Sequence, residues 1–149
     1  MIYLASDHGG FALKKKVNTL LHSLNQSVKD LGPYRLVDGD DYPDYVLPLA
    51  QAVAASGERG IISCRNGQGA AIAANKVPGI RAAVCWDVTC AISARTDDNS
   101  NILSLPADYL TDEVITEIVK AWLATPFSTD ARHIRRINKI TTYEQSEGK

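Results

Sequence analysis

Three polar segments of the 149-residue sequence combine residue types that can bind or transform a small anionic molecule. The first segment joins a carboxylate and an imidazole, Asp7 and His8, to two glycines that allow a ligand to approach the backbone closely. Such a pair can bind hydroxyl groups or transfer protons. The structural alternative is that Asp7 caps a helix while His8 is solvated.

The second segment begins at Cys64 and reads Cys-Arg-Asn-Gly-Gln-Gly. A glycine-rich turn that leads into a helix is typical of a cradle of backbone N–H groups that binds an anion. No Gly-Lys-Ser/Thr follows, and the spacing departs from Gly-x-Gly-x-x-Gly, which argues against a nucleotide-binding module. Cys64 stands beside the positive end of the expected helix, where a thiolate is favoured and can act as a base or nucleophile.

The third segment contains Arg132 and Arg136, which are four positions apart and therefore share one helix face. Two guanidinium groups on one face can grip a phosphate, and the alternative is a solvated basic face. The two cysteines outside the second segment, Cys85 and Cys90, lie in apolar stretches and are expected to serve packing only.

The composition excludes several classes of protein. Hydrophobic residues make up 45% and charged residues 22% of the chain, as in ordinary globular proteins, and the net charge of −1 disfavours nucleic-acid binding. No apolar run is long enough to span a membrane, and the first residues do not read as a signal peptide. Three cysteines without a Cys-x-x-Cys pair predict neither a disulfide framework nor a metal site. We therefore expect a cytoplasmic protein.

Short apolar runs alternate with amphipathic stretches, and this alternation predicts the elements that position the three segments. The expected strands are 2–6, 27–31, 60–64, 80–85 and 101–105. The expected helices are 11–25, 44–56 with Asp44 as N-cap, 70–75, 87–95, 111–124 and a C-terminal helix at about 129–143, with 144–149 frayed.

The alternation predicts a single α/β domain over residues 1–149, a Rossmann-like three-layer α/β/α sandwich with a five-stranded parallel sheet. Ligands of such folds bind beyond the carboxyl ends of the strands. We therefore expect the chemistry at the turns after the strands 2–6 and 60–64, and at the polar run Thr96–Ser100 before the strand 101–105.

Four stretches together resemble one known family over almost the whole chain and in the same order. They are DHGGFALK from Asp7, DYPDY from Asp41, CRNGQGAAIAANKVPGIRAAV from Cys64 and RHIRRI from Arg132. The stretches are similar to those of the ribose-5-phosphate isomerase B / galactose-6-phosphate isomerase family of sugar-phosphate isomerases. The run Gly-x-Gly-x-x-Ile-Ala-Ala-Asn-Lys within the third stretch is the most specific of these signals.

The resemblance implies an aldose–ketose isomerase that acts on a sugar phosphate through a cis-enediolate, without a cofactor or metal. It implies a homodimer or tetramer in which the active sites are shared and the C-terminal helix packs on the partner. Cysteine-type members use the cysteine of the loop as the base, which corresponds to Cys64. Other members place a glutamate where this chain has Ala70.

The remaining roles implied by the resemblance fall on residues of all three segments. Asn66 and the amides around Gly67 and Gly69 would stabilise the enediolate, although the family usually has Thr or Ser at the position of Asn66. Asp7 and Asp97 are assigned to the transfer of ring and hydroxyl protons. The residues assigned to substrate binding, besides the two glycines, are His8, Tyr42, Arg65, Asp98, Arg132 and Arg136.

Three positions depart from the family pattern towards negative charge. A ring-opening His-Asn pair is replaced by Asp97 and Asp98, and an arginine that often assists phosphate binding is replaced by Asp108. Asp97 can still transfer a proton, but a carboxyl group of ordinary acidity is a poor acid at neutral pH.

These departures leave three hypotheses open. The leading one is ribose 5-phosphate to ribulose 5-phosphate isomerisation. The others are isomerisation of another aldose phosphate, of the galactose 6-phosphate or allose 6-phosphate type, and a non-catalytic sugar-phosphate-binding homologue.

Overall fold

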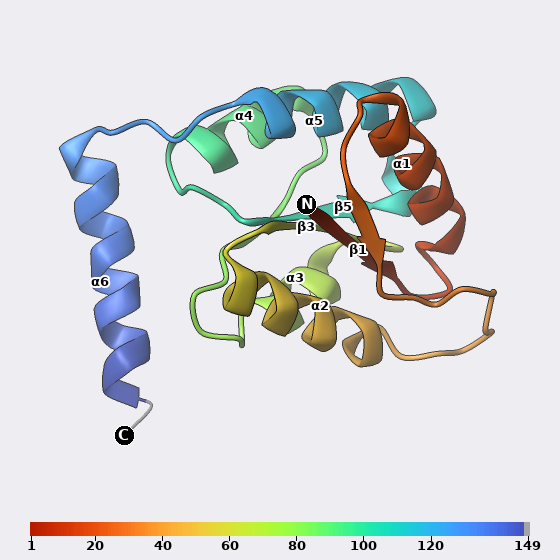
Figure 1. The fold of residues 1–149 in the computed structure, drawn as a ribbon, viewed down its shortest axis with the longest axis horizontal. Helices are drawn as coiled ribbons and strands as arrows, with labels where there is room; N and C mark the ends of the chain where they lie inside the picture. The colour runs from red at the N-terminus through yellow and green to blue at the C-terminus, as the bar shows by residue number, and fades with distance from the viewer. Residues whose placement is uncertain (148–149) are drawn as a thin grey trace.

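Five short strands form an all-parallel sheet at the centre of the computed structural model, which describes residues 1–147 (Figure 1). They are β1 (Ile2–Ser6), β2 (Val28–Asp30), β3 (Arg59–Cys64), β4 (Ala82–Val84) and β5 (Ile102–Pro106), in the spatial order β2-β1-β3-β5-β4. The chain runs outward from β1 to β2 and then crosses back to β3. The strand order therefore reverses between β1 and β3, where doubly wound sheets bind their ligands.

Helices cover both faces of the sheet, as the alternation of elements predicts. One face is covered by α1 (Phe11–Ser23), α4 (Val88–Thr96) and α5 (Asp112–Ala124), and the other by α2 (Pro43–Ser56) and α3 (Gln68–Ala74). Successive strand residues enter different cores, since Ile61 packs beneath α1 and α5 while Ile62 packs beneath α2. The expected three-layer sandwich is confirmed.

Two predicted helix starts are corrected by the backbone. Helix α2 begins at Pro43 with Tyr42 as its N-cap, so Asp44 lies in the first turn instead of capping the helix. Proline fits the first helical position because the amide it lacks has no partner there. Helix α3 begins at Gln68 instead of residue 70, because the αL conformation of Gly67 ends the preceding turn.

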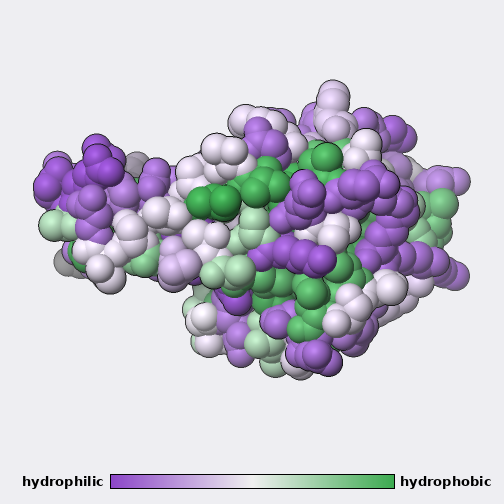
Figure 2. All heavy atoms as spheres, turned by 90° about the horizontal axis from the view of Figure 1, so that it is seen from above, coloured by the Kyte–Doolittle hydropathy of each residue, from purple (hydrophilic) through white to green (hydrophobic). Residues whose placement is uncertain are grey.

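The C-terminal helix α6 (Ala131–Glu147) stands at the side of the molecule, where it forms a mostly hydrophilic projection (Figures 1 and 2). It starts later than residue 129 and continues beyond 143, so the fraying expected from residue 144 is wrong up to 147. The Glu144 carboxylate accepts the Gly79 N–H at 3.0 Å and ties this part of α6 to the chain. Residues 148 and 149 lie outside the described residues.

Few side chains of α6 contact the rest of the chain. His133 is buried, whereas Ile134, Ile140 and Tyr143 are 39%, 50% and 65% exposed. Within residues 1–147, no helix has both the length and the apolar composition needed to cross a membrane.

Candidate active site

The turn after β1 is closed by its own aspartate. Asp7 is buried, and its Oδ1 accepts the Gly10 N–H at 2.9 Å, so the carboxylate shapes the turn into α1. The sequence left capping and chemistry as alternatives for Asp7. One carboxylate oxygen is engaged in the structural role, and the other is available to a ligand.

His8 is held by Asp40, a residue that sequence reasoning did not single out. Asp40 Oδ1 accepts the His8 N–H at 2.8 Å and lies 2.8 Å from the imidazole Nδ1. The hydrogen bond to Asp40 raises the pKa of His8 above its usual value. Burial disfavours ionisation of Asp40, but the hydrogen bonds from His8 outweigh it and lower the pKa of this carboxyl group. The turn therefore presents an imidazole whose protonated form is favoured, which suits an anionic ligand.

The turn after β1 touches the loop after β3. A Cβ atom on Gly10 would lie 2.1 Å from the Ser63 carbonyl oxygen, and one on Gly9 would lie 2.5 Å from Cγ of Arg65. The Ser63 hydroxyl donates to the Gly10 carbonyl at 3.0 Å. Glycine is required here because only a residue without a side chain allows this approach. The first and second polar segments thus form one site at the switch point of the sheet.

Cys64 is buried at the end of β3, and its sulfur faces the loop that follows. The Gly67 N–H donates to Sγ at 3.2 Å and thereby holds the sulfur against the loop. Gly67 has φ +75°, and its carbonyl accepts the Ser104 hydroxyl at 2.7 Å. Asn66 Oδ1 accepts the Gln68 N–H at 3.0 Å. Two of the N–H groups in the cradle, those of Gly67 and Gln68, are therefore already bound by the side chains of Cys64 and Asn66. The Gly69 N–H lies in the first turn of α3, where helix amides lack partners within the helix.

Tyr42 covers this loop from the start of α2. A Cβ atom on Gly69 would lie 2.8 Å from Cζ of the Tyr42 ring and 2.9 Å from its hydroxyl oxygen. The aromatic ring thus lies against the glycine-rich turn, which places Tyr42 in the same site as Cys64, although 22 residues separate them in the sequence.

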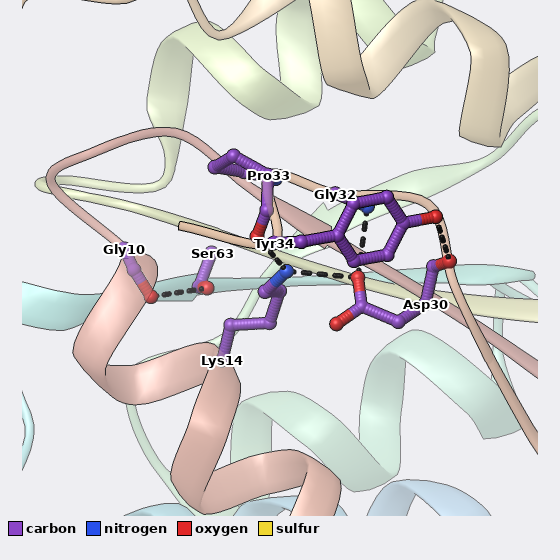
Figure 3. Close-up of polar contacts among 7 residues, drawn as sticks. All are labelled: Gly10, Lys14, Asp30, Gly32, Pro33, Tyr34 and Ser63. Atoms are coloured by element: carbon purple, nitrogen blue, oxygen red, sulfur yellow. Dashed lines mark hydrogen bonds and ion pairs between the residues drawn. The ribbon is translucent and has the colours of Figure 1, made fainter. Parts of the chain in front are cut away.

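A buried lysine supports the chain segment that leads to Asp40. Lys14 of α1 is 2% exposed, and its ammonium group donates to Asp30 Oδ1 at 2.8 Å and to the Pro33 carbonyl at 2.6 Å (Figure 3). The Asp30 carboxylate also accepts the Gly32 N–H at 2.8 Å. The Ser6 N–H donates to the Gly32 carbonyl at 3.1 Å, so the cluster binds this segment to the end of β1.

The other predicted site residues lie at the opposite edge of the sheet. Asp97 and Asp98 follow α4 and precede β5, so they stand at the amino end of a parallel strand. The prediction that the run Thr96–Ser100 joins the turns after β1 and β3 is therefore wrong for one chain. A segment before a parallel strand always lies at the edge opposite to the segments that follow the strands.

The phosphate-binding arginines predicted on α6 lie near this opposite edge. Arg136 and Asp98 line a cavity of about 390 Å³ between α6 and the start of β4. Arg132 is exposed, and its Nε lies 3.1 Å from Asp130 Oδ2. In one chain, these arginines therefore lie near the edge of the sheet opposite to Cys64, which ends β3.

Comparison with known proteins decides the family. The family model for ribose/galactose isomerases matches residues 2–140. The chain belongs to the ribose/galactose isomerase family. The resemblance predicted from the sequence is thereby confirmed.

Relatives in the ribose/galactose isomerase family match nearly the whole chain. Ribose-5-phosphate isomerase B of Mycobacterium tuberculosis is 36% identical over 146 residues, which cover 97% of this chain and 90% of that protein. The structure of Clostridium thermocellum ribose-5-phosphate isomerase B is 39% identical, covers 98% of both chains and gives a TM-score of 0.93. The structure of Mycoplasma genitalium ribose-5-phosphate isomerase B with bound ribulose-5-phosphate is 40% identical, covers 97% of this chain and 95% of that one, and gives a TM-score of 0.93.

One departure from the family pattern has a visible counterpart in the structure. Asp108 stands where the family often has arginine, and its carboxylate lies 3.5 Å from the guanidinium of Arg65 in the Cys64 loop. The Asp108 N–H also donates to the Arg65 carbonyl at 2.9 Å. Both side chains are exposed, so the charge pair is weak and Arg65 can exchange Asp108 for an anionic ligand.

Sequence reasoning missed the aromatic residues beside the loop. Trp86 and Tyr109 are 57% and 74% exposed, and they line a cavity of about 400 Å³ together with Asn66 and Gln68. No periodicity marks these positions as functional. The signal available in the sequence was their place directly after the strands β4 and β5, at the carboxyl edge where ligands bind.

Proposed function

We propose that this chain interconverts ribose 5-phosphate and ribulose 5-phosphate, with Cys64 as the base. The observation that carries the proposal is the Cys64 thiol at the switch point of the sheet, in hydrogen-bond contact with the Gly67 N–H. Family membership supports sugar-phosphate isomerisation, and the Mycoplasma genitalium relative that binds ribulose-5-phosphate supports the choice of substrate.

The isomerisation needs one base that reaches two neighbouring carbons. The Cys64 thiolate removes the proton from C2 of the open-chain aldose and returns it to C1 of the enediolate, while the hydroxyl proton of O2 moves to O1, which gives the ketose. The Gly67 N–H already donates to the sulfur and orients it within the loop. Asn66 and the Gly69 N–H stabilise the developing negative charge on the enediolate oxygen. Asp7 and Tyr42 bind the sugar.

Phosphate binding requires a second subunit in this proposal. His8, whose protonated form is favoured by Asp40, lies in the turn that touches the Cys64 loop, whereas Arg132 and Arg136 belong to α6 at the other edge of the same chain. A homodimer in which each α6 lies across the partner would bring both arginines, with Asp97 and Asp98, to the partner's Cys64 loop. The exposed apolar side chains of α6, Ile134, Ile140 and Tyr143, support such packing.

The first experiment follows ribose 5-phosphate by NMR in deuterated water with the wild-type protein. Ribulose 5-phosphate should appear and acquire deuterium, because the proton bound to sulfur exchanges with solvent. In Cys64→Ala, the rate should fall roughly a hundred- to ten-thousand-fold, as expected for loss of a general base. Cys90→Ala is the matched control, since its sulfur donates to the Val84 carbonyl outside the loop, and it should retain activity.

Three outcomes would contradict the proposal in different ways. Full activity of Cys64→Ala would refute the assigned base. Faster turnover of galactose 6-phosphate or allose 6-phosphate by the wild-type protein would refute the substrate and support an isomerase of another aldose phosphate. Binding of ribose 5-phosphate without conversion or proton exchange would support a non-catalytic homologue.

A further inference from the structure

A buried histidine outside the assigned machinery contacts one of the residues that depart from the family pattern. His133 in the first turn of α6 is 5% exposed. Its Nδ1 lies 2.7 Å from the Ser128 hydroxyl, and its Nε2 lies 3.8 Å from Oδ1 of Asp97. The Ser128 N–H donates to the Thr96 carbonyl at 3.0 Å, which fixes this segment beside the end of α4.

The arrangement gives each nitrogen of the imidazole a different neighbour. Ser128 fixes the orientation of the ring from one side, and Asp97 stands on the other side with its side chain 49% exposed. His133 thus lies behind a carboxylate that faces solvent. A histidine that holds a carboxylate in this way fixes its position, and a carboxylate that is ionised at neutral pH can accept a proton but is a poor donor.

We propose that His133 is a positioning residue that holds the Asp97 carboxylate as the base for opening the sugar ring. The inference rests on the proposed isomerase function and on the shared site that brings Asp97 to the partner's substrate. Asp97, which follows α4, and His133 on α6 then share a task that neither residue performs alone.

The chemical need comes from the substrate itself. An aldopentose 5-phosphate is a cyclic hemiacetal in solution, whereas the enediolate forms only from the open aldehyde. During opening, the bond between C1 and the ring oxygen breaks, the C1 hydroxyl loses its proton to the Asp97 carboxylate and becomes the carbonyl, and the ring oxygen takes a proton from water. His133 holds the carboxylate in place during this transfer. Asp97 then passes its proton to the hydroxide that remains, so no net proton is consumed.

The test separates ring opening from enediolate chemistry. Ribulose 5-phosphate cannot form a furanose ring because its 5-hydroxyl is esterified, so exchange of its C1 proton with deuterated solvent needs no ring opening. We expect His133→Gln to slow turnover of ribose 5-phosphate roughly a hundredfold while leaving the C1 exchange of ribulose 5-phosphate unchanged. Asp97→Asn should give the same selective loss, and the double variant should lose no more than either single variant.

The matched control is His22→Gln, an exposed histidine on α1, which should change neither rate. Ser128→Ala keeps the imidazole but removes its orienting contact, and it should lower ribose 5-phosphate turnover roughly fivefold, the equivalent of one hydrogen bond. This variant carries the test if His133→Gln does not fold. Circular dichroism and sedimentation check the fold and assembly of each variant.

Several results would overturn the inference. Unchanged turnover in folded His133→Gln, or in Ser128→Ala where His133→Gln does not fold, would show that the histidine does not assist Asp97. An equal fall of both rates would show that His133 only anchors α6. If wild-type protein catalyses neither turnover nor exchange, the proposed function itself fails, and this outcome is distinct from the other two.

Discussion

At the scale of single residues, Asp40 controls the protonation of His8. The carboxylate contacts both the backbone N–H and the ring Nδ1 of His8 at 2.8 Å. The pKa of His8 is therefore raised and that of Asp40 is lowered. A raised histidine pKa stabilises the folded state fully below the unfolded value, about 6.5, and this contribution is lost as the pH rises through the folded pKa. The Asp40 contribution is present above its unfolded pKa and is lost as the pH falls through its lowered one.

The pair yields a prediction about phosphate capture. In Asp40→Asn, the pKa of His8 should fall towards its ordinary value, because the amide cannot stabilise the imidazolium as a carboxylate does. As the pH is raised, His8 of the variant should lose its proton earlier, so the KM for ribose 5-phosphate should begin to increase at a lower pH than in the wild type. NMR titration of the His8 ring and the pH dependence of KM measure the two effects. Asp41→Asn, an exposed neighbouring change, is the control. An unshifted His8 titration in Asp40→Asn would contradict the assignment.

At the scale of elements, the Lys14 cluster joins α1 to β2 and to the segment that carries Asp40. The lysine is almost fully buried, while Asp30 retains 26% exposure of its side chain. The ammonium group also lies over the rings of Phe11 and Tyr34, 5.7 Å and 5.9 Å from their centres. A buried cation with hydrogen bonds to two acceptors fixes the relative placement of these elements.

Removal of this cation should weaken the fold measurably. In Lys14→Met, the free energy of unfolding should fall by about 1.5–3 kcal/mol, because charged hydrogen bonds are lost while Asp30 regains some water. Lys15→Met changes an exposed lysine on the same helix and should alter the free energy of unfolding by less than about 0.5 kcal/mol. Denaturant unfolding measures both variants. Equal stabilities of Lys14→Met and Lys15→Met would show that the cluster is not a structural link.

At the scale of the whole molecule, the predicted site residues divide between two edges of the sheet. Cys64 and His8 lie at the carboxyl edge, whereas Asp97 and Arg136 lie at the edge where α6 joins the body. A sheet separates the two groups in one chain, so the proposed site would be complete only with α6 of a second copy of the chain.

Mixing two inactive variants tests the shared site. Cys64→Ala lacks the base, and the double variant Arg132→Ala/Arg136→Ala lacks the phosphate-binding groups. If each site combines Cys64 of one subunit with α6 of the other, a mixed dimer has one intact site. An equal mixture that has exchanged subunits should therefore recover about a quarter of wild-type activity. No recovery after verified subunit exchange would show that each site uses residues of one chain only.

The layered fold follows from the sequence alone, because alternating strand and helix patterns are local and specify their elements directly. The sequence also predicts that Asp7, His8 and Cys64 meet, because turns after neighbouring parallel strands share one edge. The contact between Asp40 and His8 is apparent only in the folded chain, since a contact across 32 residues depends on how the intervening loop packs. The folded chain likewise places Asp97 beside His133 and both at the opposite edge, because the path of α6 is set by its contacts with the body and not by its own helical pattern.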